Sequence, residues 1–229
     1  MLAPVLAAQA VLVRRRAQFL PEPPGPRAGR SGAGRPLRLL IAGDSSAAGV
    51  GAPHQDQALA GQLVALLARH FEVTWRLEAV TGATTASMLD RLASLPEQRF
   101  DVAVTALGVN DVTRASTEAR WRARQGALLD LLRDRFGAGA VFATGLPPMR
   151  AFPLLPEPLA WVLGAQAERL DKALASLCDS RSHAHHVRIA YPPDPGLAAS
   201  DGYHPTPRAY GIWAGEMAAR ILATTGAAR

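Results

Sequence analysis

Short apolar segments and longer amphipathic segments alternate five times along this chain, and this alternation most restricts its fold. The apolar segments have the length of buried strands, and the segments between them repeat apolar residues every three or four positions, as helices do. A helical crossover returns the chain to the same end of a sheet, so strands joined in this way pair in parallel. The sequence therefore predicts a three-layer α/β/α sandwich, with helices on both faces of a five-stranded parallel sheet.

The expected elements can be placed along the chain. Strands are expected at residues 37–41, 73–80, 101–107, 140–144 and 186–190. Helices are expected at residues 58–70, 86–95, 117–136, 163–178 and 205–222. The connection at residues 149–162 interrupts the rhythm, because it is rich in both proline and apolar side chains. It either covers the core or lines an apolar cleft for a substrate.

The 229 residues are enough for one well-buried domain, which we assign to residues 37–229. An apolar segment with an arginine cluster (1–16) and a Pro/Gly/Arg-rich linker (17–36) precede it. The apolar segment is shorter than the roughly 20 residues that span a bilayer, and its positive charge follows the apolar residues, which reverses the order in a secretory signal. No cleavable signal peptide is recognised, so we expect a cytoplasmic protein. Residues 1–16 should either pack on the domain as a helix or lie in a membrane interface, with the arginines at anionic head groups.

The formal charge of +6 and the pI near 10.6 would suit a polyanionic partner. The basic residues are nearly all arginine and are scattered, however, so the sequence does not favour nucleic-acid binding. The single cysteine, Cys178, cannot form an internal disulfide and lies in an apolar-periodic stretch, which predicts a buried structural thiol. The composition carries no signal for an oligomeric state.

A serine follows directly after the first expected strand, in the stretch Gly43-Asp44-Ser45. Gly43 lets the backbone turn tightly at the carboxyl end of the strand, which is where open α/β sheets place their sites. Ser45 is therefore a candidate nucleophile. The alternative is an ordinary strand-to-loop transition that happens to contain a serine.

Later strand ends supply the other groups that acyl transfer by a serine needs. Gly82 follows the second strand, Asn110 the third, and Asp201 and His204 the last. The carboxyl ends of parallel strands share one edge, so these residues can converge on Ser45. An imidazole titrates near neutral pH, so His204 is the candidate base and Asp201 can orient it through Nδ1. The candidate oxyanion donors are the backbone N–H groups of Ser45 and Gly82 and the side-chain amide of Asn110.

Other interpretations of these residues stay open. Asn110 and Asp111 can simply cap a turn or a helix. His54 with Asp56 is a reserve base. Three histidines near the last strand have a spacing that could ligate a metal, but no nearby carboxylate set completes a site, so we expect no metal there. These are His183, His185 and His186.

Several glycine-rich motifs can be excluded. The loop at residues 43–51 lacks the Gly-Lys-Ser/Thr of a P-loop and the GxGxxG spacing of a dinucleotide site. The residues around Ser45 also lack the GxSxG elbow of α/β-hydrolases.

In their order, the remaining motifs resemble those of the SGNH (GDSL-type) hydrolase family from residue 37 to the C-terminal helix. The resemblance implies a flavodoxin-like fold and carboxylic ester hydrolysis through an acyl-serine, without metal or cofactor. It implies that Ser45 is the nucleophile, that Gly82 and Asn110 complete the oxyanion hole, and that Asp201 and His204 form the acid–base pair. Ser46 departs from the family, because many members have leucine there. This substitution suggests a subgroup with its own substrate preference.

We predict substrate contacts from the residues beside the motifs and from the apolar connection, namely Asp44, Ser46, Val109, Phe152, Leu154 and Trp161. With the apolar N-terminus, they favour short- to medium-chain acyl esters or lysophospholipid-like substrates. A carbohydrate O-acetylesterase or a thioesterase on the same site is the alternative. From another class, the chain could be a catalytically silent α/β module that binds a membrane or a partner.

Overall fold

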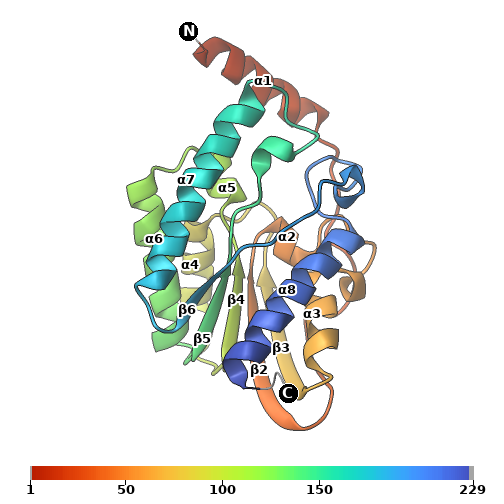
Figure 1. The fold of residues 1–229 in the computed structure, drawn as a ribbon, viewed down its shortest axis with the longest axis vertical. Coiled ribbons are helices and arrows are strands. Elements are labelled where there is room, and N and C mark those ends of the chain that lie inside the picture. Colours follow the sequence, from red (N-terminus) through yellow and green to blue (C-terminus); the bar gives the residue numbers. More distant parts are fainter. Residues whose placement is uncertain (1, 227–229) are drawn as a thin grey trace.

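The computed structural model describes residues 2–226 and is built around a six-stranded sheet with strand order β1-β3-β2-β4-β5-β6 (Figure 1). Five of the strands pair in parallel. These are β2 (Arg35–Gly43), β3 (Phe71–Ala79), β4 (Val102–Ala106), β5 (Ala140–Thr144) and β6 (Ala184–Val187). They correspond to the five predicted strands, and the predicted three-layer fold is confirmed.

The sixth strand, β1 (Ala28–Ser31), is not predicted by the sequence. It lies within the segment expected to be a linker and pairs antiparallel with β3, so it forms one edge of the sheet. All four of its residues are exposed, so it lacks the apolar alternation that marks a half-buried strand. β2 also begins inside the expected linker, at Arg35. Part of residues 17–36 therefore belongs to the sheet.

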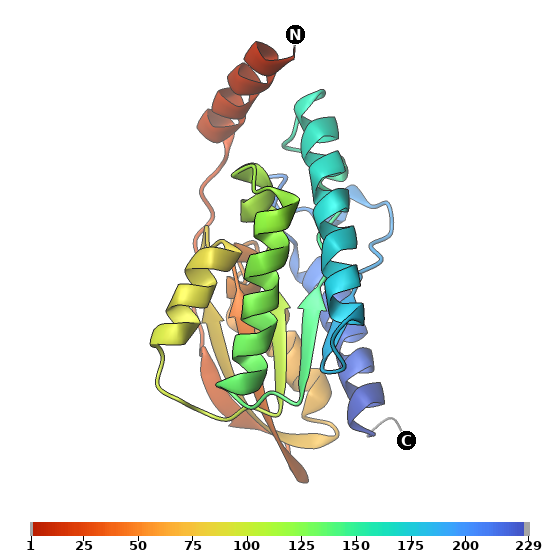
Figure 2. The same ribbon diagram turned by 90° about the vertical axis from the view of Figure 1, so that its left-hand side faces the viewer.

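Two groups of helices cover the two faces of the sheet (Figures 1 and 2). The helices α3 (Leu59–Leu67) and α8 (Pro207–Thr225) pack on one face. The helices α4 (Thr85–Ser94), α6 (Glu118–Asp134) and α7 (Leu159–Asp179) pack on the other. Successive side chains of a strand point to opposite faces. Leu39 and Ile41 of β2 accordingly enter the first core and Leu40 enters the second. Cys178 is buried in the second core, as expected.

Short elements at the carboxyl ends of the strands complete the chain. They are α2 (Ser45–Ala48), α5 (Val109–Thr113) and the 3₁₀ turns η1 (Gln55–Gln57), η2 (Met149–Ala151) and η3 (Pro195–Leu197). The apolar connection before α7 is shorter than expected, because this helix begins directly after Pro158.

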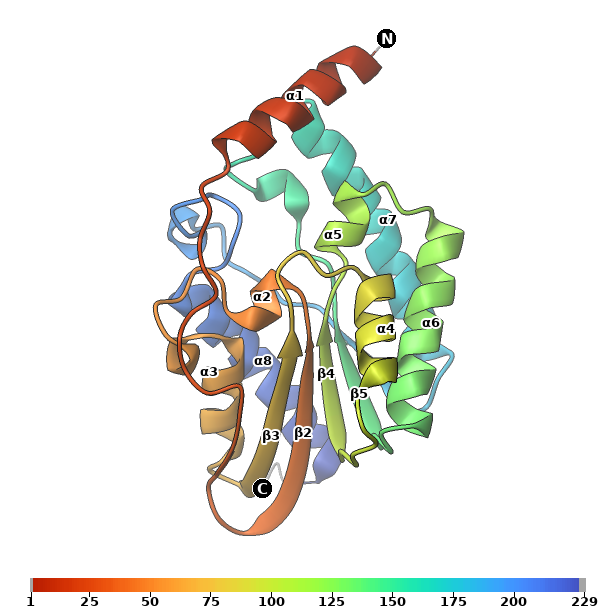
Figure 3. The same ribbon diagram turned by 180° about the vertical axis from the view of Figure 1, so that it is seen from behind.

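The N-terminal helix α1 (Ala3–Arg16) lies beyond the carboxyl ends of the strands, near the start of α7 (Figure 3). None of its residues is buried. Gln9 ties it to the domain, since its amide nitrogen donates to the Glu157 carbonyl (2.7 Å) and its amide oxygen accepts from the Leu159 N–H (3.1 Å). The expected helix therefore forms and rests on the domain through few contacts. Within residues 2–226, no helix has the length and apolar character to cross a membrane.

Candidate active site

Ser45 is the first residue of α2, immediately beyond the carboxyl end of β2. Asp44 caps this helix, because its carboxylate accepts a hydrogen bond from the Ser46 N–H at 3.0 Å. Gly43 has no room for a side chain, since a Cβ there would lie 2.4 Å from the Ala106 carbonyl oxygen. The chain can therefore turn closely past β4 and place Ser45 at the edge of the sheet.

Ser45, His204 and Asp201 lie in a hydrogen-bonded row. His204 Nε2 is 2.9 Å from Ser45 Oγ, and His204 Nδ1 is 2.5 Å from Asp201 Oδ2. The other oxygen of Asp201 accepts from the backbone N–H groups of Tyr203 and His204, both at 3.0 Å. One carboxylate thus fixes both the turn that carries His204 and the orientation of its ring. The distances suit transfer of the serine proton to the imidazole.

Asp201 is held in its charged form by its hydrogen bonds. Burial raises its pKa, but donors from the His204 side chain and from the His204 and Tyr203 backbone outweigh burial, so the pKa is lowered overall. An ionised Asp201 favours the tautomer of His204 that carries its proton on Nδ1. Nε2 is then free to accept the proton of Ser45.

Gly82 and Asn110 border the same region. Gly82 has a φ of +80°, and no atom lies within 4 Å of the position that a Cβ would take, so its backbone is open on that side. Asn110 Nδ2 donates to the Ala83 carbonyl at 3.0 Å and lies 3.4 Å from Asp44 Oδ2. An amide nitrogen carries two protons, and the longer contact leaves one of them only weakly engaged.

Two buried carboxylates lie behind these donors. Burial, with a further contribution from the charge of Asp111, raises the pKa of Asp44 to about 7. Asp111 accepts from the backbone N–H and the hydroxyl of Thr85 (2.9 and 3.0 Å), and burial raises its pKa as well. Only 3% of Asp44 is exposed. This burial does not fit its predicted contact with a substrate, and its bonds instead support Ser46 and Asn110.

Two of the predicted apolar contacts reach the loop that carries His204. The Phe152 ring packs edge-on against Tyr203, whose ring packs against His204, with centroid separations of 5.1 and 5.4 Å. The Leu154 N–H donates to the Gly202 carbonyl at 3.1 Å. Tyr203 is not among the residues that the sequence singles out, although it lies inside the motif between Asp201 and His204.

The other predicted contacts lie in two places. Ser46 and Val109 are half-buried, each beside a residue of the site, namely Ser45 and Asn110. Trp161 lies in the first turn of α7 and is 51% exposed. Its backbone N–H donates to Glu157 Oε2 at 3.3 Å, and its contact with a substrate stays a prediction.

The competing histidines lie elsewhere. His54 pairs with Asp56 at the surface (3.1 Å). His186 pairs with Asp171 of α7 (2.8 Å), and His185 stacks on a phenylalanine of β5. Across residues 2–226, no group of three or more His, Cys, Asp or Glu side chains is arranged to hold a metal ion.

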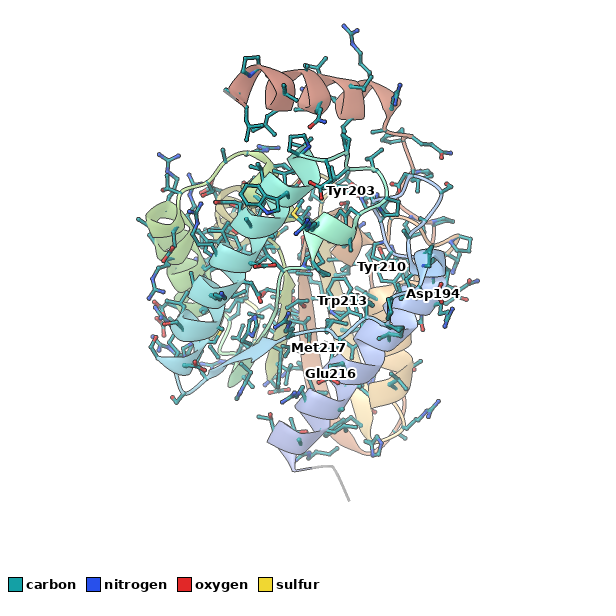
Figure 4. The ribbon with its side chains drawn as sticks, turned by 45° about the horizontal axis from the view of Figure 1, so that its top comes forward. Asp194, Tyr203, Tyr210, Trp213, Glu216 and Met217 are labelled. Atoms are coloured by element: carbon teal, nitrogen blue, oxygen red, sulfur yellow. The ribbon has the colours of Figure 1, made fainter. Side chains whose placement is uncertain are left out.

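Side chains of α8 fix the loops around the site (Figure 4). The Tyr210 hydroxyl donates to the Val50 carbonyl, just beyond α2, at 2.7 Å. Trp213 Nε1 donates to the hydroxyl of Thr144 at the end of β5, at 3.3 Å. The helix that follows His204 is therefore bonded to the loop that follows Ser45, which fixes the two parts of the hydrogen-bonded row relative to each other.

Comparisons with known proteins agree with this geometry. The sequence profile of the GDSL-like Lipase/Acylhydrolase family matches residues 41–212, which include every residue of the row. A search of curated protein sequences returns no match.

Solved structures share the fold. A psychrotrophic esterase from Pseudoalteromonas sp. has a TM-score of 0.65 and 19% identity, over 83% of this chain and 99% of its own. A lipase/acylhydrolase from Enterococcus faecalis has a TM-score of 0.61 and 18% identity, over 82% and 96%. An acetylxylan esterase from Geobacillus stearothermophilus has a TM-score of 0.56 and 14% identity, over 83% and 95%. Because the family profile covers most of the chain, this protein belongs to the GDSL-like lipase/acylhydrolase family and is a hydrolase of carboxylic esters.

Proposed function

We propose that Ser45 is the nucleophile of this ester hydrolase, His204 its general base and Asp201 the carboxylate that orients the base. The main support is the 2.9 Å separation of Ser45 Oγ and His204 Nε2. The other ring nitrogen of His204 is hydrogen-bonded to Asp201. Ser45 attacks the ester carbonyl and gives its proton to His204, which passes it to the departing alcohol. Water then attacks the acyl-serine with the same base, releasing the acid and restoring Ser45.

Three donors serve the oxyanion in this proposal. Ser45 opens α2, and the first N–H groups of a helix have no partner within it. Gly82, which is half-buried and has open space where a Cβ would lie, supplies the second N–H. Asn110 supplies the third from the amide proton that makes only the long contact to Asp44.

Labelling with a fluorophosphonate tests the nucleophile. We expect stoichiometric labelling of Ser45, and loss of both labelling and p-nitrophenyl acetate hydrolysis in Ser45→Ala. Ser46→Ala is the matched control, because it changes the adjacent serine and should keep its label. Near-wild-type hydrolysis by Ser45→Ala would overturn the assignment, and an unlabelled wild-type protein would favour a silent binding module.

For the substrate, we propose short- to medium-chain acyl esters or lysophospholipids. Phe152 and Leu154 support this proposal, because the Phe152 ring packs against Tyr203 and the Leu154 backbone is bonded to Gly202, so two apolar residues lie beside the loop that carries His204. A chain-length series of p-nitrophenyl esters, with a lysophospholipid, an acyl thioester and acetylated xylan, tests it. Higher kcat/KM on the xylan or on the thioester would replace this substrate class with a carbohydrate ester or a thioester.

We also propose that residues 1–16 bind an anionic membrane surface at the cytoplasmic face. Helix α1 has no acidic residue in its first turn and ends in three arginines, Arg14, Arg15 and Arg16. Large apolar side chains are exposed on this helix and directly before it, namely Leu2, Val5, Val11 and Leu12. Phe19 and Trp161, which are 83% and 51% exposed, add apolar surface. An apolar helix with a basic end suits the interface of a bilayer.

Co-sedimentation with phosphatidylserine-containing and with phosphatidylcholine-only vesicles tests the membrane contact. We expect the full chain to pellet with the anionic vesicles, and replacement of the three arginines by glutamine to release it. Replacement of Arg69, Arg188 and Arg208, which are exposed on the domain, is the charge-matched control. Equal pelleting of the two triple variants would count against the contact.

A further inference from the structure

We propose that residues 22–27, which we term the N-terminal strap, position the Gly82 peptide for catalysis and that Glu22 is the positioning residue. The strap lies outside the region that the family profile matches, residues 41–212. It belongs to the connection between α1 and β1, which descends past α2 and β3 (Figure 3). The inference rests on the proposed role of the Gly82 N–H as an oxyanion donor.

Glu22 holds the residue immediately before Gly82. Its Oε1 accepts from both the backbone N–H and the hydroxyl of Thr81, at 3.0 and 2.7 Å. Its Oε2 accepts from the Arg27 guanidinium at 2.8 Å. Burial raises the pKa of Glu22, but the Thr81 donors and the Arg27 charge outweigh burial and lower it overall, so the carboxylate is charged at neutral pH.

The rest of the strap is itself anchored to the sheet and to α2. Arg27 donates through its guanidinium to the Ala79 carbonyl, and its own carbonyl accepts from the Leu77 N–H at 2.7 Å. Pro23 is buried, and a Cβ on Gly49, at the end of α2, would lie 3.0 Å from its ring. The strap therefore touches both the helix that begins with Ser45 and the loop that contains Gly82.

Gly82 is held from both sides. Glu22 fixes the preceding residue, Thr81, and Arg114 donates to the Gly82 carbonyl at 3.2 Å. At a φ of +80°, glycine has wide conformational freedom, and no side chain of its own restricts it. The Ala83 N–H donates to the Val80 carbonyl at 3.0 Å and closes the turn, and the bonds from Glu22 and Arg114 act together with it to set the direction of the Gly82 N–H. An oxyanion donor stabilises the transition state only when it already points at the developing charge.

Loss of the Glu22 carboxylate should therefore lower kcat without a matching loss of folding stability. The side chains of Glu22 and Arg27 are 34% and 36% exposed, and exposed ion pairs contribute little to folding. Glu22→Ala removes both hydrogen bonds to Thr81, so the Gly82 N–H is no longer held in one direction. Glu22→Gln keeps an amide oxygen that can accept both Thr81 donors. The strap hypothesis therefore predicts that the glutamine variant rescues activity.

The experiment compares Glu22→Ala, Glu22→Gln and wild type in kcat and KM on p-nitrophenyl acetate, fluorophosphonate labelling rate and melting temperature. We expect Glu22→Ala to lower kcat and the labelling rate by about tenfold, less than the 10²–10³-fold loss when a donor is removed outright. KM, the final extent of labelling and the melting temperature should stay near those of wild type. Glu22→Gln should restore most of the kcat.

Glu72→Ala is the matched control, because Glu72 also pairs with an arginine from this region, Arg30, but at the opposite end of β3. Its kcat should match wild type. A wild-type kcat in Glu22→Ala would overturn the proposed role of the strap. Equal losses of kcat in Glu22→Ala and Glu22→Gln would also overturn it, as would a fall in melting temperature that accounts for the lost activity. An unlabelled wild-type protein would instead overturn the proposed function, so the two failures are distinguishable.

Discussion

At the scale of single residues, the site combines the reacting Ser45 and His204 with two more deeply buried carboxyl groups. Ser45 and His204 face each other at the sheet edge, while Asp44 and Asp111 lie buried behind them. Asn110 joins the two sets, since its amide nitrogen contacts both the Ala83 carbonyl and the carboxylate of Asp44. Substitutions at the two kinds of position should therefore have different effects. A substitution of Asn110 should mainly lower catalysis, and a substitution of Asp44 should mainly change stability.

Asn110→Ala removes one oxyanion donor and should lower kcat by roughly 10²–10³-fold, with little change in KM. The donor acts on charge that develops in the transition state, so substrate binding is largely spared. Steady-state kinetics on p-nitrophenyl acetate measure the effect. Thr113→Ala, on the exposed side of the same helix, is the control and should keep its kcat. A loss below tenfold in Asn110→Ala would remove Asn110 from the oxyanion hole.

Asp44→Asn should change the pH dependence of stability. The pKa of Asp44 is about 7 in the folded protein, against about 4 for an aspartate in the unfolded chain. Between these values the folded state holds more protons, so the stability due to the neutral carboxyl is lost as pH rises through 7. Asparagine caps helices as well as aspartate does and does not titrate. From about pH 5 to about pH 8 the variant should therefore gain about 2–3 kcal/mol in unfolding free energy relative to wild type. Urea unfolding at the two pH values measures this difference, and a pH-independent difference would contradict the prediction.

At the scale of elements, caps set where the helices begin relative to the site. Thr84 caps α4 in a capping box, with hydrogen bonds between its side chain and Ser87 N and between Ser87 Oγ and its own N–H. The helix therefore begins within three residues of Gly82. Thr117 caps α6 in a similar way, but far along the chain from any residue of the row.

Thr84→Ala and Thr117→Ala should each cost about 1 kcal/mol of stability through the lost cap. Only Thr84→Ala should also lower kcat, because it loosens the turn that carries Gly82 and Ala83, the residue to which Asn110 is bonded. Urea unfolding and p-nitrophenyl acetate kinetics on both variants test this. Equal kcat values in the two variants would show that the cap of α4 does not position the oxyanion donors.

At the scale of the whole molecule, α1 and the strap differ in how they join the domain. Helix α1 fully buries none of its residues and is tied through the two hydrogen bonds of Gln9 and through the partly buried side chains of Leu6 and Val13. The strap is joined to the edge of the sheet by several hydrogen bonds and by the packing of Pro23.

Removal of residues 2–16 should leave the urea midpoint and the kcat on p-nitrophenyl acetate unchanged, because little apolar area is buried by α1. Removal that extends through residue 27 should lower both, since it takes away the strap. A loss of the fold on the shorter deletion would show that α1 supports the domain.

The sequence by itself determined the five parallel strands, the long helices that cover them and the identity of the residues in the row. The pattern of apolar residues in a short segment reflects which of its side chains are buried. The apolar run from Leu39 to Ile41 therefore predicts a buried strand without knowledge of the strands beside it. The motifs at Ser45, Asn110 and His204 are likewise short and local. Their place at the ends of parallel strands is enough to predict that they converge.

Only the tertiary structure decided what surrounds that row. β1 has no apolar alternation, and the bond between Glu22 and Thr81 joins residues that are 59 positions apart. Polar contacts of this kind leave no periodic pattern in a sequence, because each depends on where two distant backbones meet. The same reason explains why Asp44, expected to contact a substrate, is buried beneath Asn110, and why a segment read as a linker holds the loop of Gly82.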